Sequence, residues 1–388
     1  MSTLFTLDDT LGQSARLKVV GVGGGGGNAL NNMINQNLRG VDFIVANTDS
    51  QAIEMSGADI KIQLGTDITR GLGAGADPQT GKVAAEAERD HLREVLADTD
   101  MLFITAGMGG GTGTGGAPVI AEVAKELGIL TVAVVTKPFN FEGKRRLRQA
   151  EAGISELARH VDTLIIIPNQ KLIGAVGKHT TMLEAFRKAD DVLLQAVRGI
   201  AELITHTGYM NVDFADVKAV MSDTAGMAMM GSGVASGESR ACEAAERAIS
   251  SPLLEDVDIH GARGILVNVT GNEDMTLAEY DEAVSIIHNM ADEDANIICG
   301  MVYDQSAGDE MRVTVVATGL AGEAGVQLTS VSNTAKEPMK MPPAHIMLGG
   351  GQESAPQAGR EAVASAATNL AYDEDTLQVP TWIRRQAD

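Results

Sequence analysis

Three glycine-rich segments constrain what this chain can fold into more than any other feature of its sequence. Residues 21–28 (GVGGGGGN) and 107–116 (GMGGGTGTGG) each follow an apolar run and precede a helix-like stretch, and residues 71–78 (GLGAGADP) lie between them. Glycine lets the backbone approach a phosphate closely, and a helix N-terminus adds N–H donors and positive potential. A tight packing turn would explain one such segment, whereas three together favour a phosphate-binding fold.

The segments around these loops alternate between strand-like and helix-like patterns. This alternation predicts an α/β layer with a parallel sheet, whose ligand lies at the carboxyl ends of the strands. The apolar run at residues 129–136 is typical of a strand buried on both faces. Strands are expected at residues 17–22, 41–46, 101–106, 129–136 and 163–167, a turn at 23–27, and helices at 29–38 and 118–127, with Pro118 in the first turn of its helix and Gly128 ending it.

A long helical pattern at residues 182–205 follows this layer. Its apolar residues recur at helical spacing, and about 24 residues would make a helix about 36 Å long, enough to cross one domain and link it to another. Beyond it, a smaller α+β unit is expected. Its apolar segments are residues 225–230, 264–269, 296–302 and 311–317, with helices at 240–250 and 277–290.

The end of the chain differs in composition from the rest. Residues 321–371 contain no aromatic residue and four of the ten prolines, which predicts a disordered linker because so little apolar surface can be buried. Residues 372–388 (YDEDTLQVPTWIRRQAD) regain apolar and aromatic side chains. A frayed terminus is the alternative, but an apolar peptide on a tether is typical of partner docking. The expected docking residues are Pro380, Trp382, Ile383 and Arg384.

The charge balance excludes several classes of function. Lys and Arg total 30 against 52 Asp and Glu, a net charge of −22, which argues against a direct nucleic-acid or anionic-membrane surface. There is no run of 18 apolar residues to insert into a membrane, and no signal-peptide pattern at the start. Cys242 and Cys299 form no CxxC. These features predict a cytoplasmic protein.

The first glycine segment contains a GxGxxG at Gly21, Gly23 and Gly26, which also fits a dinucleotide-dependent oxidoreductase. Against that alternative, the next strand leads into Asn47-Thr48-Asp49 rather than an acidic residue placed for a ribose. The second glycine segment favours a triphosphate, because two helix N-termini can converge on one polyphosphate. Neither a P-loop GxxxxGK[ST] nor an NKxD is present. In so acidic a chain, a triphosphate needs a counter-charge, so we expect bound Mg²⁺, with Arg146 as a second cation.

The stretch AGMGGGTGTGGAPVIAEVAKELGILTVAVVTKPFNFEGKRR resembles the FtsZ family, the bacterial relatives of tubulin. GVGGGGGNA, NTDSQAI, GLGAGADP, NVDFADV, MMGSGVASGE and SSPLLED resemble that family too, and the similarity covers about residues 16–320 and the tail peptide. It implies a GTPase that polymerises head to tail into filaments at the division site. The domains would then be a flexible N-terminus (1–15), a Rossmann-like nucleotide-binding domain (16–181), a central helix (182–208), a C-terminal α+β domain (209–320), a disordered linker (321–371) and the docking tail (372–388).

The resemblance also implies which residues bind GTP or GDP. The first loop would contact the nucleotide, the second would cover the phosphates, and the third would lie near the γ-phosphate. Glu142 and Arg146 would contact ribose and phosphate, while Asn169 and Asp190 would bind guanine, with Phe186 stacked on the base. A carboxylate suits guanine because it accepts from both N1–H and the 2-amino group. The loop residues are Gly24, Gly25, Gly26, Gly27, Asn28, Gly75, Ala76, Gly111, Thr112 and Gly113.

Catalysis is expected from NVDFADV, residues 211–217. Asp213 and Asp216 are three residues apart and would share one side of a helix, where two carboxylates can orient a water for attack on a phosphorus. On the residues alone, an ordinary helix N-terminus explains them too. The resemblance implies that this loop, with Asn211, completes the active site of the next subunit. A non-hydrolysing relative is the alternative that these two aspartates argue against.

The resemblance implies partners as well as activity. The chain would form a homopolymer and reach the mid-cell division site through its tail, which would bind division proteins and membrane adaptors. An acidic body that does not bind a membrane itself needs such an adaptor for attachment.

Overall fold

The computed structural model describes residues 15–175, 180–205, 212–223, 226–254 and 261–320. Its first half is a parallel sheet in the order β3-β2-β1-β4-β5-β6, which is the strand order of a doubly wound nucleotide-binding fold. All five pairings within it are parallel. The strands are β1 (Leu17–Val22), β2 (Val41–Asn47), β3 (Ile60–Gln63), β4 (Met101–Gly107), β5 (Leu130–Lys137) and β6 (Thr163–Pro168).

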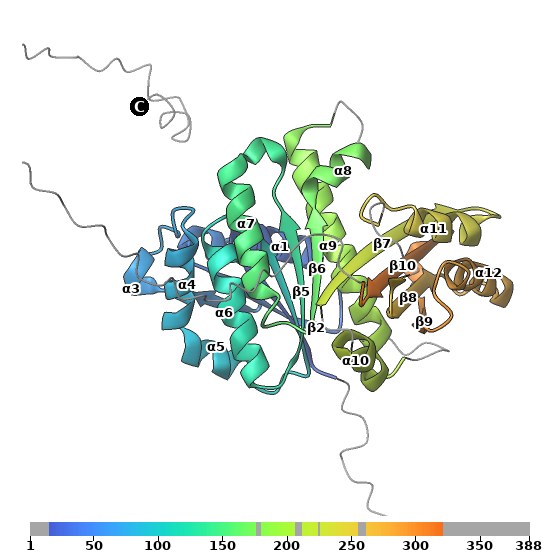
Figure 1. The fold of residues 1–388 in the computed structure, drawn as a ribbon, viewed down its shortest axis with the longest axis horizontal. Helices are drawn as coiled ribbons and strands as arrows, with labels where there is room; N and C mark the ends of the chain where they lie inside the picture. Colours follow the sequence, from blue (N-terminus) through green and yellow to red (C-terminus); the bar gives the residue numbers. More distant parts are fainter. Residues whose placement is uncertain (1–14, 176–179, 206–211, 224–225, 255–260, 321–388) are drawn as a thin grey trace, which may run out of the picture. The chain divides into compact units, whose positions relative to one another are not determined.

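Helices cover both faces of this sheet (Figure 1). Alternate strand residues bury on opposite faces: Val134 of β5 belongs to one core and Val135 to the other, which confirms a strand buried on both sides. One face carries α1 (Gly23–Asn35), α2 (Ser50–Glu54), α8 (Asn169–Ala175), α9 (Met182–Thr205) and α10 (Phe214–Asp223); the other carries α4 (Pro78–Ala87), α5 (Arg89–Leu96), α6 (Thr112–Glu126) and α7 (Lys144–Leu157).

A second group of strands continues the same sheet. The start of β7 (Gly226–Ser236) pairs in parallel with β6, and the rest of it pairs antiparallel with β10 (Glu310–Thr318). Over the described ranges the sheet therefore has ten strands, the last two being β8 (Gly264–Gly271) and β9 (Asn296–Tyr303). Helices α11 (Arg240–Ile249) and α12 (Leu277–His288) cover one face of this second group. Short helices elsewhere in the described residues include α3 (Thr66–Thr69) and 3-10 turns at Asn140–Glu142 and Gln305–Ala307.

The long helix α9 has the bounds that its pattern predicts, Met182–Thr205. Its apolar residues pack in the same core as β5 and β6 and also as β8, β9 and β10. It therefore lies against both groups of strands. No helix among the described residues is both long and apolar enough to cross a bilayer.

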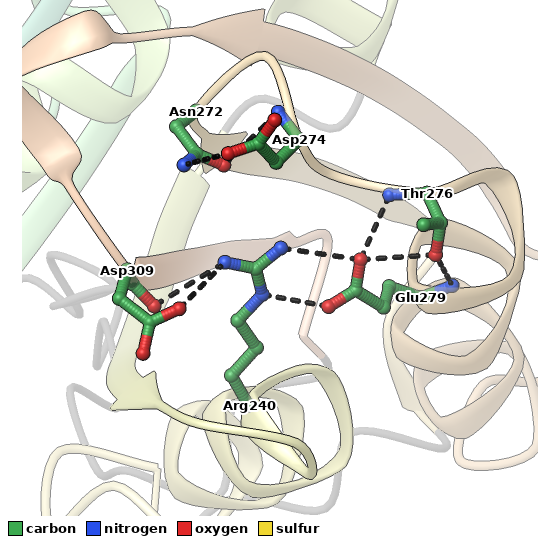
Figure 2. Close-up of polar contacts among 6 residues, drawn as sticks. All are labelled: Arg240, Asn272, Asp274, Thr276, Glu279 and Asp309. Atoms are coloured by element: carbon green, nitrogen blue, oxygen red, sulfur yellow. Dashed lines mark hydrogen bonds and ion pairs between the residues drawn. The ribbon is translucent and has the colours of Figure 1, made fainter.

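A buried arginine joins the helices of the second group (Figure 2). Arg240, at the start of α11, is 6% exposed and donates to both carboxylate oxygens of Glu279, at 2.6 and 3.2 Å. Its Nη1 also donates to the backbone carbonyl and the carboxylate of Asp309, before β10. Glu279 accepts from the backbone N–H and hydroxyl of Thr276 in a capping box at the start of α12. Asn272 and Asp274 form a separate turn beside this group.

Two expectations about helix starts are wrong. Residues 23–27 are not a turn, because α1 begins at Gly23, and it ends at Asn35 rather than residue 38. Pro118 is not in the first turn of its helix, since α6 begins at Thr112 and holds Pro118 in its interior. Glycine and proline disfavour helix interiors locally, but α6 is buried along almost its whole length and tertiary packing outweighs that preference.

The expected end of α6 is confirmed. Gly128 has a left-handed φ of 73°, and its N–H and that of Ile129 donate to Lys125 and Ala124 in the pattern of a Schellman cap. The expected linker and tail, with Pro380, Trp382, Ile383 and Arg384, lie outside the described residues, as does Asn211. The domain boundaries of the sequence analysis stay predictions.

Candidate functional site

A cavity of about 360 Å³ opens at the carboxyl end of the parallel sheet. It collects residues from segments far apart in the sequence, as expected for a doubly wound sheet. Of the predicted nucleotide residues, eleven line it: Gly24, Gly25, Asn28, Gly111, Thr112, Gly113, Glu142, Arg146, Asn169, Phe186 and Asp190. The structure thus brings most of the predicted set into one place.

The first two glycine loops pack backbone against backbone at one end of this cavity. A Cβ added at Gly23 would lie 2.8 Å from the backbone nitrogen of Gly113, so no larger residue fits there without a shift. This contact brings the start of α1 beside the start of α6. Two helix N-termini therefore meet at one site, as the sequence predicted for a polyphosphate.

Neither helix has a side chain that caps its N-terminus, and neither has an acidic residue in its first turn. The first N–H groups of a helix have no partner within it and need a cap, water or a ligand. A Cβ at Gly24 would meet nothing within 4 Å, so this part of α1 faces open space. Donors and positive helix potential are thus left for an anion.

The third glycine loop lies behind the second. Gly111 packs against Ala74 and Asp77 of this loop, where an added Cβ would be 2.8 to 3.0 Å from its atoms. Gly75 and Ala76 have a left-handed φ of 59°, are exposed, and do not line the cavity. Two other predicted residues are also outside the lining: Gly26, which is buried, and Gly27. Their contact with a nucleotide stays a prediction.

The other end of the cavity suits a purine base. Asn169 is 4% exposed, and its Oδ1 has no hydrogen-bond partner among the described residues, although buried polar atoms normally have one. Burial, and then the neighbouring Asp191, raise the pKa of Asp190 to about 7. Phe186 is 39% exposed and lies edge-on to Phe139, with ring centroids 5.3 Å apart. An exposed aromatic ring, a buried amide oxygen without a partner in the described ranges and a carboxyl group are suited to binding guanine.

Glu142 and Arg146 line the cavity as an ion pair. Arg146 Nη1 lies 2.8 Å from Glu142 Oε2, and Glu142 Oε1 accepts from the backbone N–H of Phe139. The carboxylate is thereby fixed in position. The arginine side chain is about half exposed and is the one Lys or Arg among the described residues that line the cavity.

The described residues do not form a metal site of their own. They contain no group of three His, Cys, Asp or Glu side chains arranged to hold a metal ion. In the part of the chain that the structure describes, Glu142 and Asp190 are the only carboxylates that line the cavity. The residues present therefore do not supply a Mg²⁺ ligand set, and the main ligands of such an ion would be phosphate oxygens and water.

The two predicted catalytic aspartates lie outside this cavity. Asp213 precedes α10, and its Oδ1 accepts from the backbone N–H of Asp216 at 2.8 Å. Both side chains are exposed. Asp213 thus caps a helix, which is the alternative that the residues alone leave open, and the cap uses one of its two carboxylate oxygens.

The sequence analysis missed part of the lining. Thr136 is the last but one residue of β5 and Pro138 follows the strand, so both lie at the carboxyl edge, between Gly113 and Glu142 in the sequence. Their position at the end of a buried strand could have identified them in the sequence, because ligands bind at the carboxyl ends of such strands. Gly107, Met108 and Gly110, within the second glycine segment, also line the cavity, as do Ala189 and Leu193 of α9.

Comparison with known proteins agrees with this geometry. The tubulin/FtsZ GTPase-domain model matches residues 16–177, and the C-terminal domain model of the FtsZ family matches residues 226–321. The chain belongs to the tubulin/FtsZ family. Both halves of an FtsZ-type chain are thus present, which confirms the expected fold; nothing supports the oxidoreductase alternative.

Relatives within the FtsZ family cover nearly the whole chain. "Cell division protein FtsZ" of Coxiella burnetii is 59% identical over 335 residues, 85% of this chain and 86% of its own. The protein of the same name from Azotobacter vinelandii is 52% identical over 99% of this chain and 100% of its own. The solved "FtsZ dimer, empty" of M. jannaschii is 47% identical, with a TM-score of 0.76 over 79% of this chain and 89% of that one.

Proposed function

We propose that this chain is a cytoskeletal GTPase of bacterial cell division, which binds GTP in the cavity and hydrolyses it in a head-to-tail filament. Membership of a GTPase-domain family and relatives named for cell division support the activity and the process. Beyond this, we propose that the chain forms a filament, that particular residues bind the nucleotide, and that hydrolysis depends on assembly.

One observation carries the assignment of the ligand. The cavity has two uncapped helix N-termini at one end, and Asn169, Asp190 and Phe186 at the other. Uncapped N–H groups suit phosphates, while a carboxylate suits the N1–H and 2-amino donors that distinguish guanine from adenine. Mg²⁺ would enter with the nucleotide as the counter-ion of its phosphates.

Hydrolysis needs a carboxylate near the phosphates, which the described residues of the cavity do not provide. Of its two carboxylates, Glu142 is paired with Arg146, and Asp190 lies at the base end. Asp213 and Asp216 are exposed and outside the cavity. We infer that a neighbouring copy brings them, together with Asn211, to the γ-phosphate, where the carboxylates hold and polarise the attacking water.

If two copies complete each site, hydrolysis can occur only where the copies have assembled. One copy offers its cavity and the next its α10 region, so each contact joins two different surfaces. Such heterologous contacts generate open filaments when they do not close into a ring. The relative from M. jannaschii is described as a dimer, which is consistent with association between copies.

The tail provides the link to the division site. Residues 372–388 carry Pro380, Trp382, Ile383 and Arg384 at the end of a long proline-containing segment. We infer that this peptide binds division proteins and membrane adaptors in the cytoplasm at mid-cell. Adaptors are needed because the net charge of −22 opposes direct contact with an anionic membrane.

Concentration dependence tests the shared site. Light scattering and phosphate release are measured together at rising protein concentration, with GTP and Mg²⁺. Both signals are expected to appear above one critical concentration and to vanish when EDTA removes the metal. Phosphate release per chain that does not change with concentration would contradict the proposal.

Mixing two inactive variants tests it more directly. Gly24→Val places a side chain in the cavity without backbone obstruction, and Asp216→Asn removes one proposed catalytic carboxylate. In an equimolar mixture, about a quarter of the contacts would join an intact cavity to an intact α10 region, so partial activity should return. Gly261→Val, at an exposed and unobstructed glycine, is the matched control and should behave as wild type. No recovery on mixing would place the whole active site in one chain.

A further inference from the structure

Thr48 lies directly behind the cavity and contacts one of its lining residues. It follows the last residue of β2, is 0% exposed, and does not line the cavity itself. Its hydroxyl oxygen is 2.6 Å from that of Thr112, which begins α6 and does line the cavity. In the sequence, Thr48 stands in the segment Asn47-Thr48-Asp49, which argues against a dinucleotide site.

The burial of Thr48 decides which of the two hydroxyls donates the hydrogen bond. Each hydroxyl has one proton to give. Among the described residues, Thr48 Oγ1 has no acceptor other than Thr112 Oγ1. If Thr112 donated, the proton of Thr48 would be buried without a partner, which is costly. Donation by Thr48 gives its buried proton an acceptor, and the proton of Thr112, which lines the cavity, stays available to water or a ligand there.

The backbone of Thr48 is fixed by the third glycine loop. Its carbonyl oxygen accepts from the N–H of Gly73 and from the hydroxyl of Thr69, both at 3.2 Å. Its own N–H donates to Asn47 Oδ1 at 2.8 Å. Thr48 therefore connects the loop of residues 71–78 to the start of α6.

We propose that Thr48 is a positioning residue of the nucleotide site: its hydroxyl donates to Thr112 and so directs the proton of Thr112 toward an anionic oxygen of the bound nucleotide. This inference rests on the proposed function, because it takes the ligand to be a nucleotide with its phosphates at the two helix N-termini. Thr48 touches no ligand and acts only through Thr112.

Two pairs of variants isolate the hydroxyl of Thr48. Thr48→Val keeps the shape of the side chain and removes the donor, whereas Thr48→Ser keeps the donor. We expect Thr48→Val to weaken GTP affinity about tenfold and Thr48→Ser to stay within about twofold of wild type. If Thr48→Val does not fold, Thr48→Ala compared with Thr48→Ser measures the same hydroxyl.

A double-mutant cycle shows whether Thr48 acts through Thr112. GTP dissociation constants are compared for Thr48→Val, Thr112→Val and the double variant. The double variant should bind as Thr112→Val does, because the hydroxyl of Thr48 has no other role at the site. Thr131→Val is the matched control. Thr131 is also 0% exposed, but it lies near the start of β5, away from the cavity, and its hydroxyl donates to the carbonyl oxygen of Ile129. This variant should lower stability and leave GTP affinity unchanged.

The outcomes separate this inference from the function on which it rests. Wild-type affinity in Thr48→Val, or additive losses in the double variant, would overturn the role of Thr48. Failure of the wild-type chain to bind GTP would instead overturn the proposed function.

Discussion

The backbone N–H of Asp216 donates to the carboxylate of Asp213 at 2.8 Å, so one proposed catalytic residue caps the helix that carries the other. The cap uses one carboxylate oxygen and fixes the direction of the side chain. Structural and catalytic roles therefore coincide at Asp213, and a simple alanine substitution would confound them.

We predict that Asp213→Asn separates the two roles. Asparagine caps helices as well as aspartate does, so stability should stay near wild type, whereas loss of the charge should slow GTP hydrolysis by about a hundredfold or more. Asp213→Ala should slow hydrolysis equally and also lower the free energy of unfolding by about 1 kcal/mol. Phosphate release and urea unfolding measure the two effects. Hydrolysis at the wild-type rate in Asp213→Asn would remove this residue from the mechanism.

Asp190 should make nucleotide binding depend on pH. Burial first, and then Asp191, raise its pKa to about 7 in the empty cavity, while guanine requires the ionised carboxylate as acceptor. GTP affinity is therefore expected to rise as pH increases through about 7, by up to about tenfold per unit below that value. Titration calorimetry between about pH 5.5 and pH 8.5 measures it.

Two variants test the origin of this dependence. Asp190→Asn should bind more weakly at high pH and show a flat profile. Asp191→Asn removes one cause of the raised pKa, so its binding profile should move to lower pH.

The stability of the protein without nucleotide should depend on pH in the opposite direction. The pKa of Asp190 in the folded protein lies above its unfolded value of 3.8, so the contribution of Asp190 to stability falls as pH rises from about 4 through about 7.

Neighbouring glycines of α1 should differ sharply in their tolerance of a side chain. A Cβ at Gly26 would lie 2.3 Å from the carbonyl oxygen of Thr105, whereas one at Gly24 would meet nothing within 4 Å. Gly26→Ala should lower the free energy of unfolding by about 3 kcal/mol through overpacking. Gly24→Ala should keep the stability and weaken GTP binding, because its methyl group enters the cavity. Equal stabilities of the two variants in urea would refute this assignment.

The Arg240–Glu279 pair should stabilise the second group of strands above acidic pH. Hydrogen bonds from Arg240 first, and then from Thr276, lower the pKa of Glu279 to about 2, below its unfolded value of 4.5. Its contribution is therefore complete above about pH 4.5 and is lost as pH falls toward 2. Glu279→Ala should cost about 3 kcal/mol at neutral pH, because it leaves a buried arginine without its main partner.

Urea unfolding of wild type and variants at neutral and acidic pH measures this contribution. The double variant Arg240→Met, Glu279→Leu is the control: the only ion-pair partner it leaves among the described residues is the exposed carboxylate of Asp309, so no unpaired charge is buried and much of the loss should be recovered. If the wild type loses no more stability in acid than the double variant does, the assignment is contradicted.

Much of the fold was predictable because its signals are local. The bounds of α9 follow from helical spacing over many residues, and Gly128 ends α6 where glycine can adopt a left-handed φ. The beginnings of α1 and α6 were not predictable from spacing. Their first turns are glycine-rich and would favour loops in isolation, but packing between the two backbones makes them helical.

The sequence by itself predicted a phosphate-binding fold, because three glycine-rich segments together favour that chemistry over packing turns. The tertiary structure decided which glycine does what: Gly24 faces the cavity, whereas Gly26 packs against β4. It also decided that Asn169 and Asp190, from different helices, meet beside two uncapped N-termini. Such contacts depend on how helices pack on both faces of the sheet, and packing joins residues whose distance along the chain carries no signal.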